Sequence, residues 1–242
     1  MMNENEKIDV MAIGAHPDDV EITCGGTLFK LSNMGYKIAI VDLTKGEMGS
    51  RGNVSIRTKE AECARKTLGA KVRINLELSD SFLENERETK AKVVKTLRRY
   101  RPRLLFLPHR KQRHPDHRKT SEIVYDSCHL SGLEEYRTGS LKPFRPHKII
   151  YCTSFLAVEP SIIIDISDSM EGKLNAVRCY KSQFEPIDGE MVVYPPAFDM
   201  EDYILTDARY YGYKASVKYG EPFYIPEPIL IENPLLMKVP SI

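Results

Sequence analysis

The chain has 242 residues, of which 42% are hydrophobic and 29% are charged, and its formal net charge is +1. This composition predicts one globular domain over residues 1–242 with a real buried core. The balanced charge argues against binding to nucleic acid or a membrane surface. Residues 1–7 are polar and no stretch is long enough to span a membrane, so we expect a cytoplasmic protein.

Apolar segments alternate with amphipathic segments along the first two thirds of the chain. The expected strands are residues 9–13, 37–43, 72–76, 104–107, 147–153 and 162–166. The expected helices are residues 20–34, 57–68, 86–100, 115–130 and 170–183. This alternation of helices with continuously apolar strands predicts a Rossmann-like α/β fold, with a mostly parallel sheet and helices on both faces.

The end of the chain has a different composition. Residues 197–219 are expected to form a helix, and residues 221–242 are rich in proline and apolar side chains, which limits regular structure. We expect this C-terminal segment, about residues 220–242, to pack along the domain or against a neighbouring subunit. The five cysteines have no C-x-x-C spacing and are expected to be reduced thiols.

Two motifs of metal-ligand residues follow expected strands. The first is Gly14-Ala15-His16-Pro17-Asp18-Asp19-Val20-Glu21, after the first strand, and the second is His114-Pro115-Asp116-His117, after the fourth. In a Rossmann-like strand order these two strands are neighbours, and ligands bind at their carboxyl ends. We therefore expect the motifs to face each other and to hold one divalent ion between them.

His16, Asp19 and His117 are the expected metal ligands. A His₂Asp set leaves positions open for water and substrate, as at a catalytic zinc site, and it also suits Fe²⁺. The alternative is that His16 is a strand-end or helix-capping residue, with Asp18 or Asp19 as the N-cap. The matching position of the second motif weighs against that alternative.

The chain resembles the LmbE/PIG-L-like family of zinc-dependent N-acetylglucosamine deacetylases. Besides the two motifs, the similarity covers Gly25-Gly26, residues 44–52, Arg57 and Glu60-Ala61. Residues 181–184 and 219–223 are similar to the branch that deacetylates N-acetylglucosaminyl malate in bacillithiol biosynthesis. The resemblance implies that preferred substrate. A general N-acetylglucosamine or chitooligosaccharide deacetylase is the alternative, and a nucleic-acid-binding module using the basic residues 92–119 is a minor one.

The resemblance also implies catalytic roles. Zinc would be held by the three ligands named above, and Asp18 would be the general base that deprotonates the attacking water. His114 would stabilise the oxyanion and is a candidate acid for the leaving amine. Asp116, between two histidines, would orient an imidazole.

Three further residues are candidate substrate contacts. Arg51 matches the family's substrate-binding arginine, and its guanidinium could pair with a carboxylate or bind sugar hydroxyls. Glu47 lies in the same loop, and Tyr194 precedes a double proline where it could cover the site or simply pack. We expect a small-molecule partner, neither nucleic acid nor a membrane, and the family implies a homo-oligomer, a hexamer.

Overall fold

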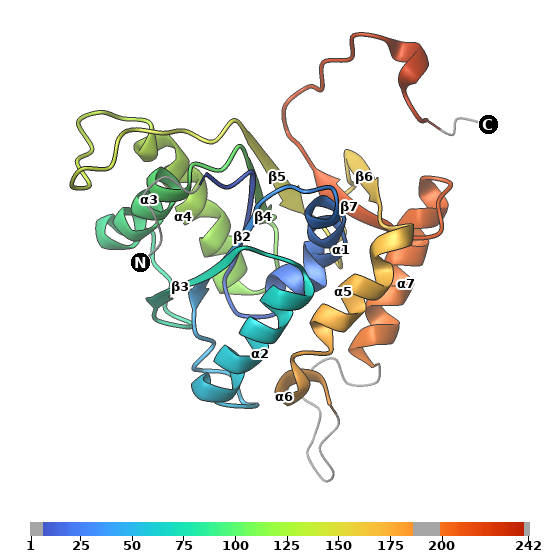
Figure 1. The fold of residues 1–242 in the computed structure, drawn as a ribbon, viewed down its shortest axis with the longest axis horizontal. Helices are drawn as coiled ribbons and strands as arrows, with labels where there is room; N and C mark the ends of the chain where they lie inside the picture. Colours follow the sequence, from blue (N-terminus) through green and yellow to red (C-terminus); the bar gives the residue numbers. More distant parts are fainter. Residues whose placement is uncertain (1–6, 186–198, 240–242) are drawn as a thin grey trace.

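The structure is a computed structural model that describes residues 7–185 and 199–239 (Figure 1). A seven-stranded sheet with the order β3-β2-β1-β4-β5-β7-β6 lies at the centre of these described residues. The strands are β1 (Val10–Gly14), β2 (Ile38–Thr44), β3 (Val72–Leu78), β4 (Leu104–Pro108), β5 (Lys148–Cys152), β6 (Ile162–Asp165) and β7 (Gly220–Tyr224). β1 pairs in parallel with both β2 and β4, which confirms the predicted α/β fold and the adjacency of the first and fourth strands.

Helices cover both faces of the sheet (Figure 1). The helices are α1 (Asp19–Asn33), α2 (Val54–Thr67), α3 (Arg87–Tyr100), α4 (Pro115–Ser131), α5 (Met170–Val177), α6 (Lys181–Phe184) and α7 (Met200–Lys214). α1, α2 and α5 share one apolar core with the sheet, and α3 and α4 share a second core on the other face. Every residue of β1 and β2 is buried, as the continuous apolar runs predicted.

The C-terminal segment begins as a strand inside the sheet. β7 lies between β5 and β6 and pairs antiparallel with both, so the expectation of little regular structure is wrong for residues 220–224. Pro222 removes one backbone donor, yet its carbonyl still accepts from the N–H of Thr153. The buried carboxylate of Glu221 is bound by the ammonium of Lys173 at 2.6 Å, so a charge is paired within this strand.

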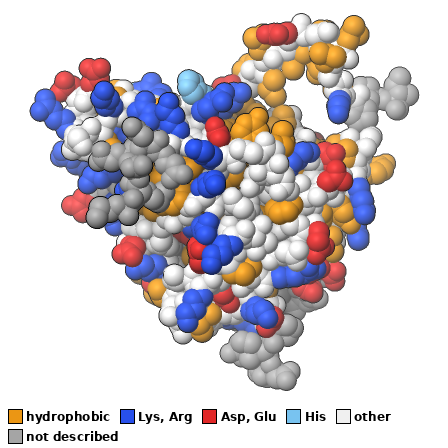
Figure 2. Space-filling model, in the orientation of Figure 1, with side chains coloured by type: hydrophobic (Ala, Val, Ile, Leu, Met, Phe, Trp, Pro, Cys, Tyr) orange, Lys and Arg blue, Asp and Glu red, His pale blue; other side chains and the backbone are white. Residues whose placement is uncertain are grey.

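Residues 225–239, here called the C-terminal arm, leave the sheet and extend away from it (Figure 1). Large apolar side chains on the arm are exposed, with Leu230 at 88% and Leu235 at 90%. Figure 2 shows hydrophobic side chains gathered on this projection. Residues 226–239 of the arm are therefore exposed, whereas Ile225 is still hydrogen-bonded to Ser161. Packing of the arm against a neighbouring subunit stays a prediction.

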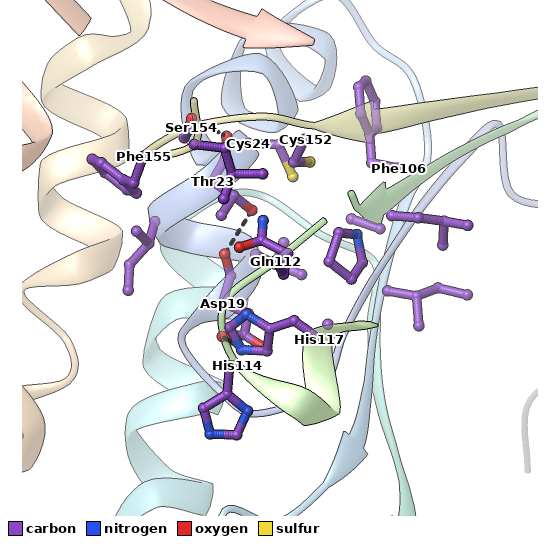
Figure 3. A pocket seen from close by; sticks show the side chains of 18 of the residues that line it. Asp19, Thr23, Cys24, Phe106, Gln112, His114, His117, Cys152, Ser154 and Phe155 are labelled. Carbon is purple, nitrogen blue, oxygen red and sulfur yellow. Dashed lines mark hydrogen bonds and ion pairs between the residues drawn. The ribbon is translucent and has the colours of Figure 1, made fainter. Parts of the chain in front are cut away.

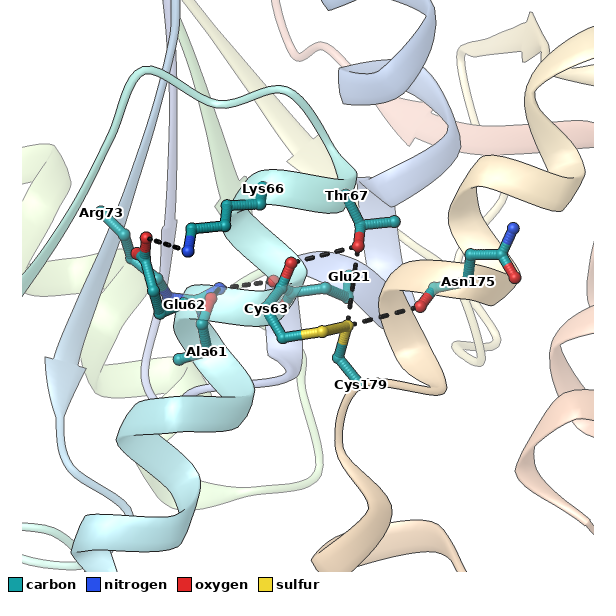
Figure 4. Close-up of a disulfide and its surroundings, with 9 residues drawn as sticks. All are labelled: Glu21, Ala61, Glu62, Cys63, Lys66, Thr67, Arg73, Asn175 and Cys179. Atoms are coloured by element: carbon teal, nitrogen blue, oxygen red, sulfur yellow. Dashed lines mark hydrogen bonds and ion pairs between the residues drawn. A yellow bond between two sulfur atoms is a disulfide. The ribbon is translucent and has the colours of Figure 1, made fainter.

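Cys63 on α2 and Cys179 after α5 form a disulfide (Figure 4). The expectation of five reduced thiols is therefore wrong for this pair, while the other three cysteines are free and buried. α2 and α5 pack together and bring the two Cα atoms to 5.8 Å, a normal separation for a disulfide. A separation of 116 residues leaves no local pattern from which the pairing could be predicted. Among the described residues, no helix is both long and apolar enough to cross a membrane.

Candidate metal centre and catalytic site

The loop between β1 and α1 folds around the carboxylate of Asp19. Asp19 Oδ2 accepts hydrogen bonds from the backbone N–H groups of Ala15 and His16, both at 2.9 Å. Gly14 allows this close approach, because a Cβ at that position would lie 2.9 Å from the Cβ of Asp19. Asp18, the N-cap of α1, has a φ of 114°, a strained backbone for a residue other than glycine.

The second motif begins α4. His114 is the N-cap of this helix, and its Nδ1 accepts a hydrogen bond from the backbone N–H of Asp116 at 3.2 Å. Pro115 at the first helical position needs no hydrogen-bond acceptor for its nitrogen. Because Nδ1 is an acceptor, a neutral His114 carries its proton on Nε2. Burial and the nearby His117 and His16 lower the pKa of His114, which favours that neutral form.

The two motifs meet beside the carboxyl ends of β1 and β4. His117 Nε2 lies 3.1 Å from Asp19 Oδ1, and His16 Nδ1 lies 3.6 Å from Asp19 Oδ2. The ring centroids of His16 and His117 are 5.4 Å apart, and those of His114 and His117 are 4.9 Å apart. Figure 3 shows Asp19, His114 and His117 at one end of a pocket.

These separations fit a shared metal ion. Zinc bonds to nitrogen and oxygen are about 2.0–2.2 Å long, so two ligand atoms of a tetrahedral site lie about 3.3–3.5 Å apart. The distance of 3.1 Å from His117 Nε2 to Asp19 Oδ1 and that of 3.6 Å from His16 Nδ1 to Asp19 Oδ2 are close to this value, each on a different oxygen of the carboxylate. One nitrogen each of His16, His114 and His117 lies within 4.8 Å of the others, a cluster that has His114 where the predicted ligand set has Asp19, so that set stays a prediction. The donors suit both zinc and Fe²⁺.

Asp80, which the sequence analysis did not single out, contacts the ring nitrogen of His16 that does not face Asp19. His16 Nε2 lies 3.0 Å from Asp80 Oδ1 and 3.4 Å from Asp116 Oδ2. Carboxylates in this position fix the tautomer and the orientation of a metal-binding histidine, and leave its Nδ1 free to bind the ion. The only sequence signal for Asp80 is its place just beyond the third strand, without a motif around it.

Asp80 is itself held by the loop after β2. Its Oδ2 accepts from the backbone N–H of Met48, and its own N–H donates to Glu47 Oε1, each at 2.9 Å. Glu47, a predicted substrate contact, thus binds the backbone of Asp80, and its substrate role stays a prediction. Asp116 is fixed in the same way, because its Oδ2 accepts from the N–H of Ser81 at 2.7 Å.

The cluster attracts positive charge. Burial alone would lower the pKa of His16, but hydrogen bonds to Asp116, Asp19 and Asp80 outweigh it and raise that pKa to about 12. Burial would raise the pKa of Asp19, and the adjacent His117 and His16 instead hold it well below its usual range. The arrangement that retains a proton here also favours a divalent cation.

Asp18 is bound by Arg57, whereas Asp19 contacts the histidines. Arg57 Nη2 donates to Asp18 Oδ2 at 3.1 Å and to the carbonyl of Pro17 at 2.6 Å, and Nη1 donates to the carbonyl of Gly46 at 3.1 Å. Burial raises the pKa of Asp18 to about 7; Arg57 opposes this rise and Asp19 adds to it. A carboxyl with such a pKa can accept and return a proton at neutral pH.

The structure places Arg51 against α6. Its guanidinium donates to the carbonyls of Gln183 at 2.8 Å and Glu185 at 2.6 Å, and Gln183 Nε2 donates back to the carbonyl of Arg51 at 2.8 Å. These bonds tie the loop after β2 to α6, and substrate binding by Arg51 stays a prediction. Tyr194 lies outside the described residues.

A cavity of about 580 Å³ opens beside the two motifs (Figure 3). Its volume is typical of a small-molecule site, about 300–1,000 Å³. Asp19, His114 and His117 form one part of its wall. The site therefore combines a cation-attracting cluster, a separate carboxyl with a pKa near neutrality and room for a substrate.

Known proteins that are similar to this chain include deacetylases. The family model described as PIG-L, GlcNAc-PI de-N-acetylase, matches residues 11–128. Diacetylchitobiose deacetylase from Thermococcus kodakarensis is 32% identical over 228 residues, covering 90% of this chain and 82% of the relative. The crystal structure of a protein from Thermus thermophilus, described only as the conserved protein TT1542, superimposes with a TM-score of 0.83 at 34% identity, covering 93% of this chain and 97% of that one. A probable N-acetyl-alpha-D-glucosaminyl L-malate deacetylase 2 from Bacillus cereus is 27% identical, covering 73% of this chain and 84% of the relative.

Proposed function

The chain belongs to the PIG-L family of de-N-acetylases, and from that premise we propose that it is a metal-dependent hydrolase that removes acetate from a short N-acetylglucosamine oligosaccharide such as diacetylchitobiose. The observation that carries the proposal is the meeting of His16, Asp19 and His117 beside a separate carboxyl, Asp18. The diacetylchitobiose deacetylase is more similar to this chain than the malate deacetylase. The comparisons thus favour the oligosaccharide over the malate conjugate that the sequence motifs suggested.

His16 Nδ1, the Asp19 carboxylate and His117 Nε2 would hold the metal, and we propose zinc, with Fe²⁺ as the alternative. A bound divalent ion acts as a Lewis acid on the amide carbonyl and lowers the pKa of water to about 7. Asp80 and Asp116 keep the His16 ring oriented by accepting from its Nε2.

Asp18 accepts a proton from the water that attacks the amide carbonyl. Its pKa of about 7 suits this role, and Arg57 holds its carboxylate in one orientation. As water adds to the carbonyl carbon, the carbonyl oxygen becomes an oxyanion, and the Nε2–H of His114 donates to it, a contact whose loss typically costs about 10²–10³ in rate. The carbon–nitrogen bond then breaks, the leaving amine takes the proton that Asp18 gained, and the products are acetate and the free amine.

Acetate release tests this function directly. Full-length protein, loaded with zinc or stripped with a chelator, would be given diacetylchitobiose, N-acetylglucosamine and N-acetylglucosaminyl malate. We expect metal-dependent turnover with the highest kcat/KM on diacetylchitobiose. Turnover of the malate conjugate alone would overturn diacetylchitobiose as the proposed substrate. No release of acetate from any of the three compounds by zinc-loaded or iron-loaded protein would overturn the deacetylase function.

We also propose that the protein is a homo-oligomer, a hexamer as the family implies. The apolar side chains on the C-terminal arm support this, because exposed apolar segments of this kind are usually covered by another chain. Light scattering on the full chain and on a variant without the arm tests it. We expect a smaller assembly after the deletion, and a monomeric full-length chain would contradict the proposal.

A further inference from the structure

The cavity extends from the histidines into an apolar chamber. Its described walls away from Asp19 and the histidines are mainly hydrophobic side chains from the sheet, α1 and the segment after β5. Among them are Ile13, Val20, Phe106, Leu107, Phe155 and Leu156. Figure 3 shows Phe106, Phe155 and the thiols of Cys24 and Cys152 around this part of the pocket.

Two of the hydroxyl groups that line the cavity donate to backbone carbonyls. Thr23 Oγ1 donates to the carbonyl of Asp19 at 2.7 Å, and Ser154 Oγ donates to the carbonyl of Thr23 at 3.3 Å. Cys24 and Cys152 are buried thiols, which are weak hydrogen-bond donors. Besides Asp19 and the histidines, the other polar side chains of the lining are Gln112 and Arg113, next to His114, and Tyr203 on α7. A sugar ring buried against the apolar walls would leave several hydroxyls without partners there, which is unfavourable.

An alkyl chain has the opposite preference. Burying each methylene group in such surroundings strengthens binding about fourfold. An acetyl group offers only one methyl group to these apolar walls. The apolar walls are therefore matched to a longer acyl chain, with the sugar on the solvent side of the metal ligands.

We propose that this chamber binds the acyl chain of the substrate, and that besides N-acetyl substrates the protein also hydrolyses N-acyl glucosamines with longer chains, such as butanoyl and hexanoyl. The inference rests on the proposed deacylase chemistry and names the substrate class of the same site. The reaction is the same hydrolysis: water adds across the amide bond, giving a carboxylate and the free amine.

A chain-length series tests the chamber. Metal-loaded full-length protein would be given N-acetyl, N-propanoyl, N-butanoyl and N-hexanoyl glucosamine. We expect kcat/KM to rise about fourfold with each added methylene until the chamber is filled. A fall in kcat/KM with every added carbon would overturn the proposal.

A substitution in the chamber wall gives a second readout. Cys152→Met places a larger side chain at the chamber and should lower kcat/KM for the hexanoyl substrate at least tenfold more than for the acetyl substrate. Cys128→Met is the matched control, because Cys128 is also a free buried cysteine but packs in the core under α3 and α4. An unchanged hexanoyl-to-acetyl ratio in a folded Cys152→Met variant would contradict the assignment.

Calorimetric binding of free acetate, butanoate and hexanoate separates the chamber from the catalytic proposal. We expect affinity to rise about fourfold per methylene in the wild type and to lose that dependence in Cys152→Met. This trend without hydrolysis of any amide would support the chamber and overturn the deacylase function. Hydrolysis of the acetyl substrate without any trend would support the deacylase and overturn the chamber.

Discussion

Asp80 provides the sharpest test of how the proposed metal ligands are held. Its Oδ1 lies 3.0 Å from His16 Nε2, while its Oδ2 accepts from the backbone N–H of Met48. Burial would raise the pKa of Asp80, but the hydrogen bonds from His16 and Met48 lower it to about 2. The group is therefore an anion at neutral pH, and it favours the His16 tautomer that leaves Nδ1 free to bind a metal ion.

The size of the effect follows from these contacts. A hydrogen bond to a charged group contributes about 1.5–3 kcal/mol, and Asp116 Oδ2 keeps a longer contact of 3.4 Å with the same nitrogen after Asp80 is removed. We therefore expect Asp80→Ala to weaken the free energy of metal binding by about 1.5–2 kcal/mol, which raises the dissociation constant for the metal about 10- to 30-fold. Excess metal should restore most of the turnover, since Asp80 acts through His16.

Asp80→Asn is the informative second variant. The aspartate accepts on both oxygens, so the NH₂ group of an asparagine would face a donor, either His16 Nε2–H or the Met48 N–H. We expect the asparagine variant to lose metal affinity as well. Asp126→Asn removes the same charge from a residue that contacts Asn85 and Lys90, and should leave metal affinity unchanged.

Competition with a chromophoric zinc chelator measures these dissociation constants directly. Zinc binding within twofold of the wild type by both Asp80 variants, while they remain folded, would refute the supporting role of Asp80. Equal losses in Asp126→Asn would point instead to a general effect of net charge.

Other predictions concern the base, the loop after β2 and the disulfide. Asp18→Asn should retain metal and lose about 10²–10⁴ in turnover, whereas Asp19→Asn should lose the metal; equal metal loss in both would contradict the division of roles. Arg51→Ala should reduce turnover of diacetylchitobiose and the malate conjugate equally, because both terminal nitrogens of Arg51 donate to backbone carbonyls. A selective loss on the malate conjugate would instead support substrate binding by Arg51. Reducing the Cys63–Cys179 disulfide should lower the free energy of unfolding by up to about 4–5 kcal/mol, given its 116-residue separation, and equal denaturation midpoints with and without reductant would contradict this.

The centre of the fold was predictable because its signals are local. Continuous apolar runs marked β1 and β4. A motif of metal-ligand residue types begins at the end of β1, and another follows β4 after residues 109–113. The strand order of parallel α/β sheets then placed the motifs side by side, as the structure confirms for the strands. These inferences needed only short stretches of sequence and one general rule of topology.

The parts that were missed depend on long-range contacts. β7 joins the sheet between β5 and β6 although its sequence, Gly220 to Tyr224, has a proline and a charge and no alternating pattern. Asp80 is a lone carboxylate whose importance comes from its distance to His16, 64 residues earlier. In each case the decisive partner lies on another element, and the residue's own neighbours in sequence do not reveal it.

The strained backbone at Asp18 links the first motif and the loop after β2 into one unit. A φ of 114° lets two consecutive carboxylates turn to different partners, Asp19 to the histidines and Asp18 to Arg57. Such a conformation costs about 1–3 kcal/mol, and a charged hydrogen bond of the kind Arg57 donates contributes about 1.5–3 kcal/mol, enough to offset it. Arg57 can reach Asp18 only because Gly46 has no side chain, since a Cβ there would overlap Arg57 Nη1. The first motif therefore depends physically on the loop after β2.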